Sequence, residues 1–240
     1  MEKKNEMKKV LLGLTTTNNS DWRNKIKEIK KFNIKEVALF STVLSMEERK
    51  ELYNLLEKTS VEFIPHVHLR DDSESWELDY LTEKYNTHVF NIHAYEQNFN
   101  FLNLNGNYRE KIFVENQEKI SDCFTKILGV CGGVCLDVSH YEDYGKIQKE
   151  KTYDDFENLL ENYYVGCCHI SAVRREPYQY EHYLNDKKFL CYANHLLSSM
   201  EELDYVKKYV KYLPKFISIE LENSIEEQLE IKKYLENIIE

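Results

Sequence analysis

The stretch Gly133–His140, with the sequence GVCLDVSH, combines the features that decide the fold of this chain. A short run of apolar residues that opens with glycine is typical of a buried strand. Successive side chains of a strand point to opposite faces, so Asp137 shares a face with Cys135 while Leu136 points the other way. A carboxylate at the end of a buried strand, followed by His140, indicates a polar site at that end.

Similar runs recur along the chain, and the stretches between most of them have helical periodicity. The expected strands cover residues 10–16, 36–40, 61–67, 88–94, 111–116, 133–138, 165–170 and 216–221. Ser45 with Glu48, and Ser199 with Glu202, have the spacing of a helix capping box. Eight units of about 25 to 30 residues predict an α/β fold, a (β/α)8 TIM barrel, with residues 1–240 as one domain. An open doubly wound sheet is the alternative, but residues 12–22 contain no glycine-rich phosphate turn.

The composition excludes several classes of protein. The chain has 240 residues, of which 42% are apolar and 13% aromatic, so it can fill a sizeable core and is not mainly disordered. Its formal net charge of −10 argues against binding nucleic acid through a broad basic surface. No apolar run reaches the roughly 18 to 20 residues of a membrane span, and the charged start lacks a signal peptide's apolar stretch. We expect a soluble, cytoplasmic protein with reduced cysteines.

Six consecutive expected strands end in residue types that bind metals. These residues are His66, His93, Glu115, Asp137 with His140, His169 and Glu220. Any one of them alone would be read as a structural or solvated side chain, so the prediction depends on the whole set. Buried carboxylates without partners are costly, and divalent cations would compensate them. His68 shares the face of His66 and is a reserve ligand, whereas His88 begins its strand and belongs to the opposite end.

These motifs resemble the endonuclease IV branch of the xylose isomerase-like barrel superfamily, over about residues 60–223. IPHVHL resembles the proline–histidine pair of that family's third strand, FNIH the asparagine-x-histidine of the fourth, and VEN the glutamate of the fifth. GVCLDVSH, CHIS and ISIELEN match the sixth, seventh and eighth strands. The resemblance implies up to three divalent ions, with zinc expected first and manganese next. The ligands it implies are His66, His93, Glu115, Asp137, His140, His169 and Glu220.

The family also uses an aspartate-x-histidine pair between the seventh and eighth strands, and here the pattern breaks. Counting forward from the seventh strand gives His182, and counting back from the eighth gives His195. Tyr180 and Ala193 stand where the aspartate would be. The acidic neighbour Glu181 favours His182 slightly, and both histidines are kept as candidates.

The loops resemble a different branch of the superfamily. The endonucleases insert side chains into DNA from loops after the early strands, but residues 40–49 are short and lack an aromatic wedge, and the chain has threonines at positions 15–17 in place of an early histidine motif. The sugar isomerase and epimerase branch uses a smaller metal set, which corresponds to Glu115, Asp137, His169 and Glu220. Arg175 resembles a substrate-contacting arginine of that branch.

Three hypotheses follow. The first is metal-assisted hydrolysis of damaged DNA or a smaller phosphoester, with Glu115 bridging the cations. The second is isomerisation of a sugar or keto-acid with one metal, in which Glu115 and Glu220 form the acid/base pair. The third is a barrel that binds a metal or ligand without turnover. Substrate contacts are expected from Arg174, Arg175 and Tyr141, and the oligomeric state stays open.

Overall fold

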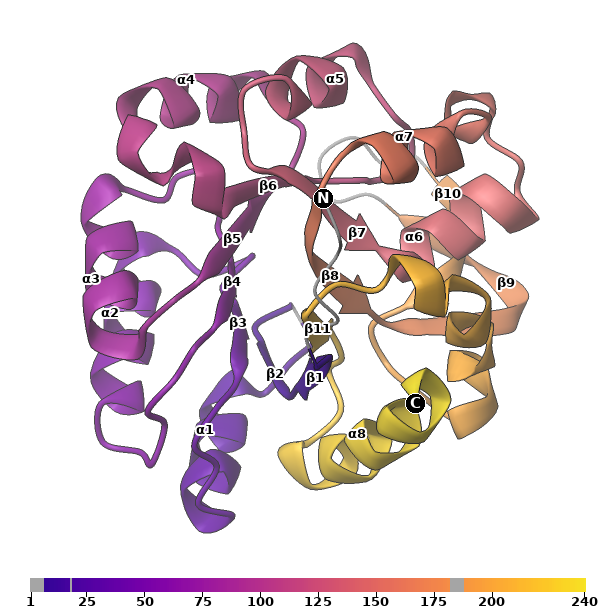
Figure 1. The fold of residues 1–240 in the computed structure, drawn as a ribbon. Helices are drawn as coiled ribbons and strands as arrows, with labels where there is room; N and C mark the ends of the chain where they lie inside the picture. Colours follow the sequence, from indigo (N-terminus) through magenta and orange to yellow (C-terminus); the bar gives the residue numbers. More distant parts are fainter. Residues whose placement is uncertain (1–6, 18, 182–187) are drawn as a thin grey trace.

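The fold is a parallel barrel surrounded by helices, and the computed structural model describes residues 7–17, 19–181 and 188–240 (Figure 1). The barrel strands are β1 (Lys9–Leu11), β2 (Gly13–Thr15), β3 (Ala38–Phe40), β4 (His66–His68), β5 (Val89–Ile92), β6 (Ile112–Glu115), β7 (Gly133–Asp137), β8 (Val165–Ile170) and β11 (Phe216–Ile219). They form one sheet in the order β1-β11-β8-β7-β6-β5-β4-β3-β2, with every pair parallel. The third strand starts later than predicted, at His66, because Pro65 before it has no N–H to donate.

Helices lie outside the barrel and cover its strands (Figure 1). They are α1 (Trp22–Lys31), α2 (Met46–Leu56), α3 (Ser75–Tyr85), α4 (Glu96–Leu104), α5 (Asp122–Leu128), α6 (Val138–His140), α7 (Phe156–Asn162) and α8 (Ile225–Ile239). The chain also contains the 3₁₀ helices η1 (Gly106–Lys111), η3 (Lys151–Tyr153) and η4 (Met200–Tyr212) and the π-helix η2 (Tyr141–Ile147). None of the helices in the described ranges combines the length and apolar character that crossing a membrane requires.

One of the two predicted capping boxes is confirmed. Ser45 and Glu48 bond reciprocally at the start of α2, as predicted. The prediction at Ser199 and Glu202 is wrong, because Ser199 Oγ donates to Glu201 and Glu202 accepts from the Ser198 N–H. The segment that follows is the 3₁₀ helix η4 rather than an α-helix.

The first predicted strand closes the barrel because its first half pairs with one edge of the sheet and its second half pairs with the other edge. β1 pairs with β11 and β2 pairs with β3, and only Leu12 separates the two halves. Gly13 permits this crossing, since a Cβ there would lie 1.8 Å from the carbonyl oxygen of Ile219. The side chain of Gln228, on α8, bonds to both the N–H and the C=O of Gly13. The prediction of a (β/α)8 barrel is therefore confirmed, with its first strand divided.

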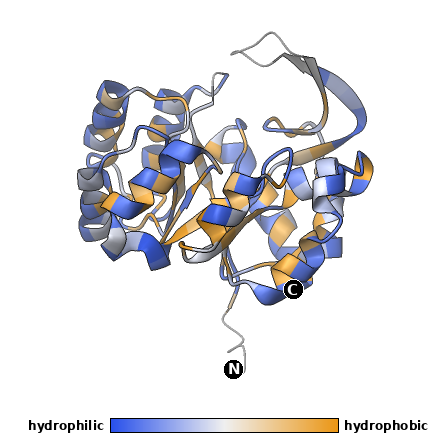
Figure 2. Cartoon of the chain, turned by 90° about the horizontal axis from the view of Figure 1, so that it is seen from above, coloured by the Kyte–Doolittle hydropathy of each residue, from blue (hydrophilic) through white to orange (hydrophobic). Residues whose placement is uncertain are grey.

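Two apolar cores lie on the two faces of the sheet. The larger core lies between the strands and the helices, whose outer faces are mostly hydrophilic (Figure 2). The smaller core fills the inside of the barrel with Leu11, Ala38, Phe40, Val89, Phe113, Cys135, Cys167 and Phe216. All six cysteines are free thiols, as predicted. Polar side chains occupy the barrel interior beyond this small core, at the carboxyl ends of the strands.

A two-stranded ribbon, which the sequence did not predict, follows β8. β9 (Ala172–Glu181) and β10 (Lys188–Asn194) are antiparallel, and the ribbon stands beyond the barrel on the side away from the N terminus (Figure 2). Asp143, on the π-helix η2, accepts hydrogen bonds from the N–H groups of Tyr192 and Ala193, at 2.8 and 2.9 Å. This buried carboxylate ties the base of the ribbon to the segment that follows β7.

Replacing Gly133 with alanine is expected to destabilise the protein strongly. Gly133 has a φ of +137°, and an added Cβ would lie 2.1 Å from the Tyr164 carbonyl oxygen. Backbone strain and overpacking together predict a loss of about 2 to 5 kcal/mol in the free energy of unfolding, measured by urea denaturation. Gly106→Ala is the control, because nothing lies within 4 Å of its added Cβ. Equal urea midpoints for the two variants would contradict this account.

Candidate metal centre

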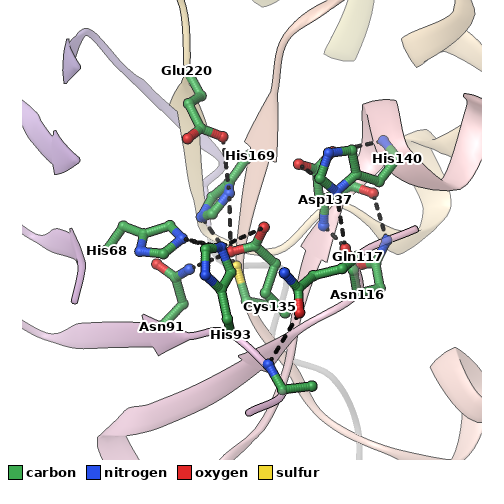
Figure 3. Close-up of polar contacts among 12 residues, drawn as sticks. His68, Asn91, His93, Asn116, Gln117, Cys135, Asp137, His140, His169 and Glu220 are labelled. Carbon is green, nitrogen blue, oxygen red and sulfur yellow. Dashed lines mark hydrogen bonds and ion pairs between the residues drawn. The ribbon is translucent and has the colours of Figure 1, made fainter. Parts of the chain in front are cut away.

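The carboxyl ends of the central strands bring imidazoles and carboxylates together inside the barrel mouth (Figure 3). Parallel pairing sets this arrangement, because Asp137 is directly opposite His169 and Glu115 is directly opposite Cys135. The residues gathered here are His68, His93, Glu115, Asp137, His140, His169 and Glu220.

Glu115, at the end of β6, is the centre of the cluster. Its Oε2 lies 2.9 Å from His68 Nε2 and 3.7 Å from His169 Nδ1, and its Oε1 lies 3.9 Å from His93 Nε2. The residue is only 2% exposed. Burial alone would raise the pKa of Glu115, but the charges of the neighbouring imidazoles, that of His169 foremost, hold it well below its usual range. Glu115 is therefore an anion enclosed by three histidines.

His169, near the end of β8, lies between two carboxylates and a thiol. Its Nδ1 is 3.3 Å from Glu220 Oε2 and its Nε2 is 3.2 Å from Cys135 Sγ. Burial lowers the pKa of His169, yet Glu115 and Glu220 outweigh burial and raise it to about 10. Burial likewise opposes ionisation of Glu220, but His195 and His169 bring its pKa down to about 2.

Asp137 and His140 form a second pair at the end of β7. Asp137 Oδ1 accepts from the His140 N–H at 2.8 Å, so this carboxylate caps the turn that follows the strand. Asn116 holds the Asp137 backbone at both its N–H and its C=O. Burial disfavours the His140 cation, but Asp137, 3.4 Å away, raises the pKa of His140 to about 9. The pair sits one strand away from Glu115.

The residues present fit a divalent cation. Two groups of potential ligand atoms include Glu115, and within each group all the atoms lie within 4.8 Å of one another. The first group also contains His68 and His93, and the second also contains Asp137 and His169. His169 Nδ1 is buried between the carboxylates of Glu220 and Glu115, at 3.3 and 3.7 Å, but neither contact has hydrogen-bond geometry. A divalent cation that binds this nitrogen together with Glu115 would replace these loose ion pairs and compensate the buried carboxylates. Imidazole and carboxylate donors suit zinc or manganese.

The sequence predicted His66 as a metal ligand and His68 as its reserve. In the structure, His68 is the one that contacts Glu115. His66 lies in a donor group with Cys135 and His169, but both its ring nitrogens are engaged. Nδ1 is 2.7 Å from Ser218 Oγ, and Nε2 is 2.9 Å from Asn91 Oδ1. The physical reason is depth: side chains two residues apart share a strand face, so the earlier histidine lies one layer further inside the barrel.

The candidates between the seventh and eighth strands differ in what the structure describes. His182 lies outside the described residues. His195 lies beside Glu220, with its Nδ1 3.2 Å from the Glu220 carbonyl oxygen. His88 is exposed at the opposite end of the barrel, where its ring stacks on Phe216, in the position predicted for it.

The three expected substrate contacts are not brought to the centre. Tyr141 is 1% exposed and packs against Tyr153 and Phe156, because it starts the π-helix on the outside of the sheet. Arg174 stacks over Tyr178 on the ribbon. With Arg175 it lines a depression between β9 and the residues that precede and begin η4. The sequence could not show this, because the ribbon that carries both arginines was not predicted.

Several polar residues that support the centre were not predicted as site residues. Asn91, Cys135 and Ser218 each precede a predicted ligand by two positions, so strand alternation alone places them on the inner face, one layer deeper. Asn91 Nδ2 donates to Glu115 Oε2 at 2.6 Å. Asn116 follows Glu115 directly and holds the neighbouring strand, which no spacing in the sequence reveals.

No protein-family model matches the chain, and none of the curated proteins matches it. It is similar to a xylose isomerase-like TIM barrel protein from Mycobacterium smegmatis solved in complex with magnesium, with a TM-score of 0.46, 9% identity, and coverage of 96% of this chain and 97% of that one. An uncharacterized B. cereus protein gives a TM-score of 0.47 and 13% identity over 94% of this chain and 64% of that one, so the match spans less than two thirds of that protein. The chain's own strand order and side chains define its class, a parallel barrel with a candidate metal centre.

Proposed function

We propose that this barrel is a divalent-metal-dependent phosphoester hydrolase whose cations share Glu115. The observation that carries the proposal is the position of this carboxylate, which belongs to two donor groups at once. A carboxylate shared by two cations is a common feature of sites that hold metals about 3.5 to 4 Å apart. One group would use His68 and His93 and the other Asp137 and His169, with zinc as the first expectation and manganese as the second.

Bound cations in such a site activate a water molecule and neutralise the phosphate oxygens. The protein's residues would hold the ions in place and keep the site dry. Glu115 and Glu220 are 2% and 6% exposed, so charges at this depth interact strongly. Within the described part of the chain, the carboxylates of the centre form ion pairs with histidines and with no lysine or arginine. The positive charge that a phosphate needs would therefore come from the metals.

A small phosphoester is a better substrate for this site than damaged DNA. A DNA-binding surface needs several basic side chains along the phosphate backbone, and this chain carries a net charge of −10. The two arginines after β8 lie on the ribbon strand β9 and not at the centre. A substrate with one or two phosphate groups can be bound by the metals alone.

Isomerisation of a sugar or keto-acid is the second candidate, and a specific observation favours it. Glu115 and Glu220 lie on either side of His169 Nδ1, at 3.7 and 3.3 Å. Two buried carboxylates around one imidazole could hold a single metal and move a proton between adjacent carbons of a substrate. This mechanism does not need His68 or His93.

Metal stoichiometry by elemental analysis of protein purified without chelators is expected to give at least two divalent ions per chain. The double variant His68→Gln/His93→Gln should lose one ion and its phosphodiesterase activity. His88→Gln is the matched control, because that histidine lies at the other end of the barrel. One ion per chain, unaffected by the double variant, would favour the isomerase. No ion after reconstitution would leave only a barrel that binds a ligand without turnover.

A further inference from the structure

A chain of hydrogen bonds crosses the barrel interior and ends on the carboxylate of Glu115. Ser218 on β11 is 2.7 Å from His66 on β4, His66 is 2.9 Å from Asn91 on β5, and Asn91 is 2.6 Å from Glu115 on β6. Ser218, His66 and Asn91 are fully buried and Glu115 almost so. The chain thus joins strands from different parts of the barrel wall.

One amide fixes the direction of two bonds in this chain. Asn91 Nδ2 donates to a carboxylate oxygen of Glu115, so Asn91 Oδ1 faces His66 and accepts. His66 Nε2 must then carry a proton, and Nδ1 lies 2.7 Å from the Ser218 hydroxyl, which can either donate or accept. In this arrangement the ring has no free lone pair with which to bind a metal.

Asn91 differs from the other neighbours of Glu115. The remaining described contacts of this carboxylate are with His68, His93 and His169, which are all candidate ligands. A histidine that binds a cation gives up its hydrogen bond on the same nitrogen. Asn91 is therefore the described donor that can still orient Glu115 when ions are bound.

We infer that His66 is a positioning residue that orients Glu115 through Asn91, and that His68 takes the ligand position expected for His66. This inference rests on the proposed metal centre. Groups that hydrogen-bond to metal ligands from behind fix the ligand's orientation, and their loss costs about 10- to 100-fold in metal affinity. The inner layer of the barrel thus prepares the shared carboxylate before any ion arrives.

The test compares three variants and includes a measurement that needs no metal. His66→Gln keeps an N–H group near the place of Nε2, so it should bind as many ions as wild type with affinity within about threefold. His66→Leu should bind the same number about 10- to 100-fold more weakly. His68→Gln should lose one ion per chain. If His66→Gln loses an ion, His66 is a ligand and the inference is wrong.

The tautomer of His66 is measured on protein labelled with ¹⁵N-histidine, and His66→Gln identifies its signals. We expect Nε2 to carry a proton both without metal and with zinc bound. An Nε2 that carries no proton, or a nitrogen signal that shifts on coordination, would overturn the inference. This measurement decides the question even if His66→Leu does not fold. Absence of bound metal in wild type would refute the proposed function while leaving this test in force.

Discussion

Glu115→Gln is expected to abolish binding of both metal ions while leaving the barrel folded. The amide keeps the size of the side chain but removes the charge that three histidines surround. Because both donor groups use this carboxylate, the loss in affinity should exceed the roughly 100-fold upper range seen when an outer partner is removed. Elemental analysis after dialysis, together with zinc titration by calorimetry, measures the effect.

Glu118→Gln is the matched control for that experiment. Glu118 lies three residues further along the chain, is exposed, and belongs to none of the donor groups found in the described residues. The Glu118→Gln substitution changes the net charge by the same amount as Glu115→Gln, so a general electrostatic effect would appear in both variants. Retention of one tightly bound ion in Glu115→Gln would show that the two groups bind independently and that Glu115 is not shared.

Most of the fold could be predicted from the sequence because each strand is a short apolar run with its own boundary signals. The eight strand positions were found, and polar residues at the ends of six consecutive strands pointed to the right edge of the sheet. The division of the first strand at Leu12 could not be predicted, because it depends on Gly13 lying against Ile219 from the far end of the chain. The ribbon was missed because its two strands pair antiparallel in a sheet of their own, outside the repeat of strand and helix that defines the barrel.

The site was predicted less completely, and depth is the physical reason. Alternation places His66 and His68 on the same face but does not say which of them reaches the mouth. The answer depends on partners from other strands, since Ser218 and Asn91 engage the deeper ring. Tyr141 shows a similar limit, because a π-helix after β7 turns its ring outward and no local sequence pattern indicated that turn.

The metal-free protein should lose a stabilising contribution of His169 as the pH rises from 6.5 to 9.5. Glu115 and Glu220 overcome burial and raise the pKa of His169 from 6.5 to about 10 in the folded state. A group whose folded pKa is raised stabilises the protein fully below its unfolded value and loses this effect as the pH approaches the folded value. The linkage relation gives a loss of about 3 kcal/mol over this range.

Wild type must be compared with His169→Gln, because another group contributes in the opposite direction. Burial opposes ionisation of Cys167, but Cys135 and His66 bring its pKa down to about 5, which favours the folded state as the pH rises. The difference in free energy of unfolding between the two proteins reports His169 together with the ionised groups that its charge stabilises, and this difference should shrink with rising pH. Saturating zinc should stabilise wild type increasingly over the same range, because the ion takes the place of the proton on His169. A difference that stays constant from pH 6.5 to 9.5 would mean that the two carboxylates do not hold a proton on His169. The main electrostatic argument for a cation at this position would then be wrong.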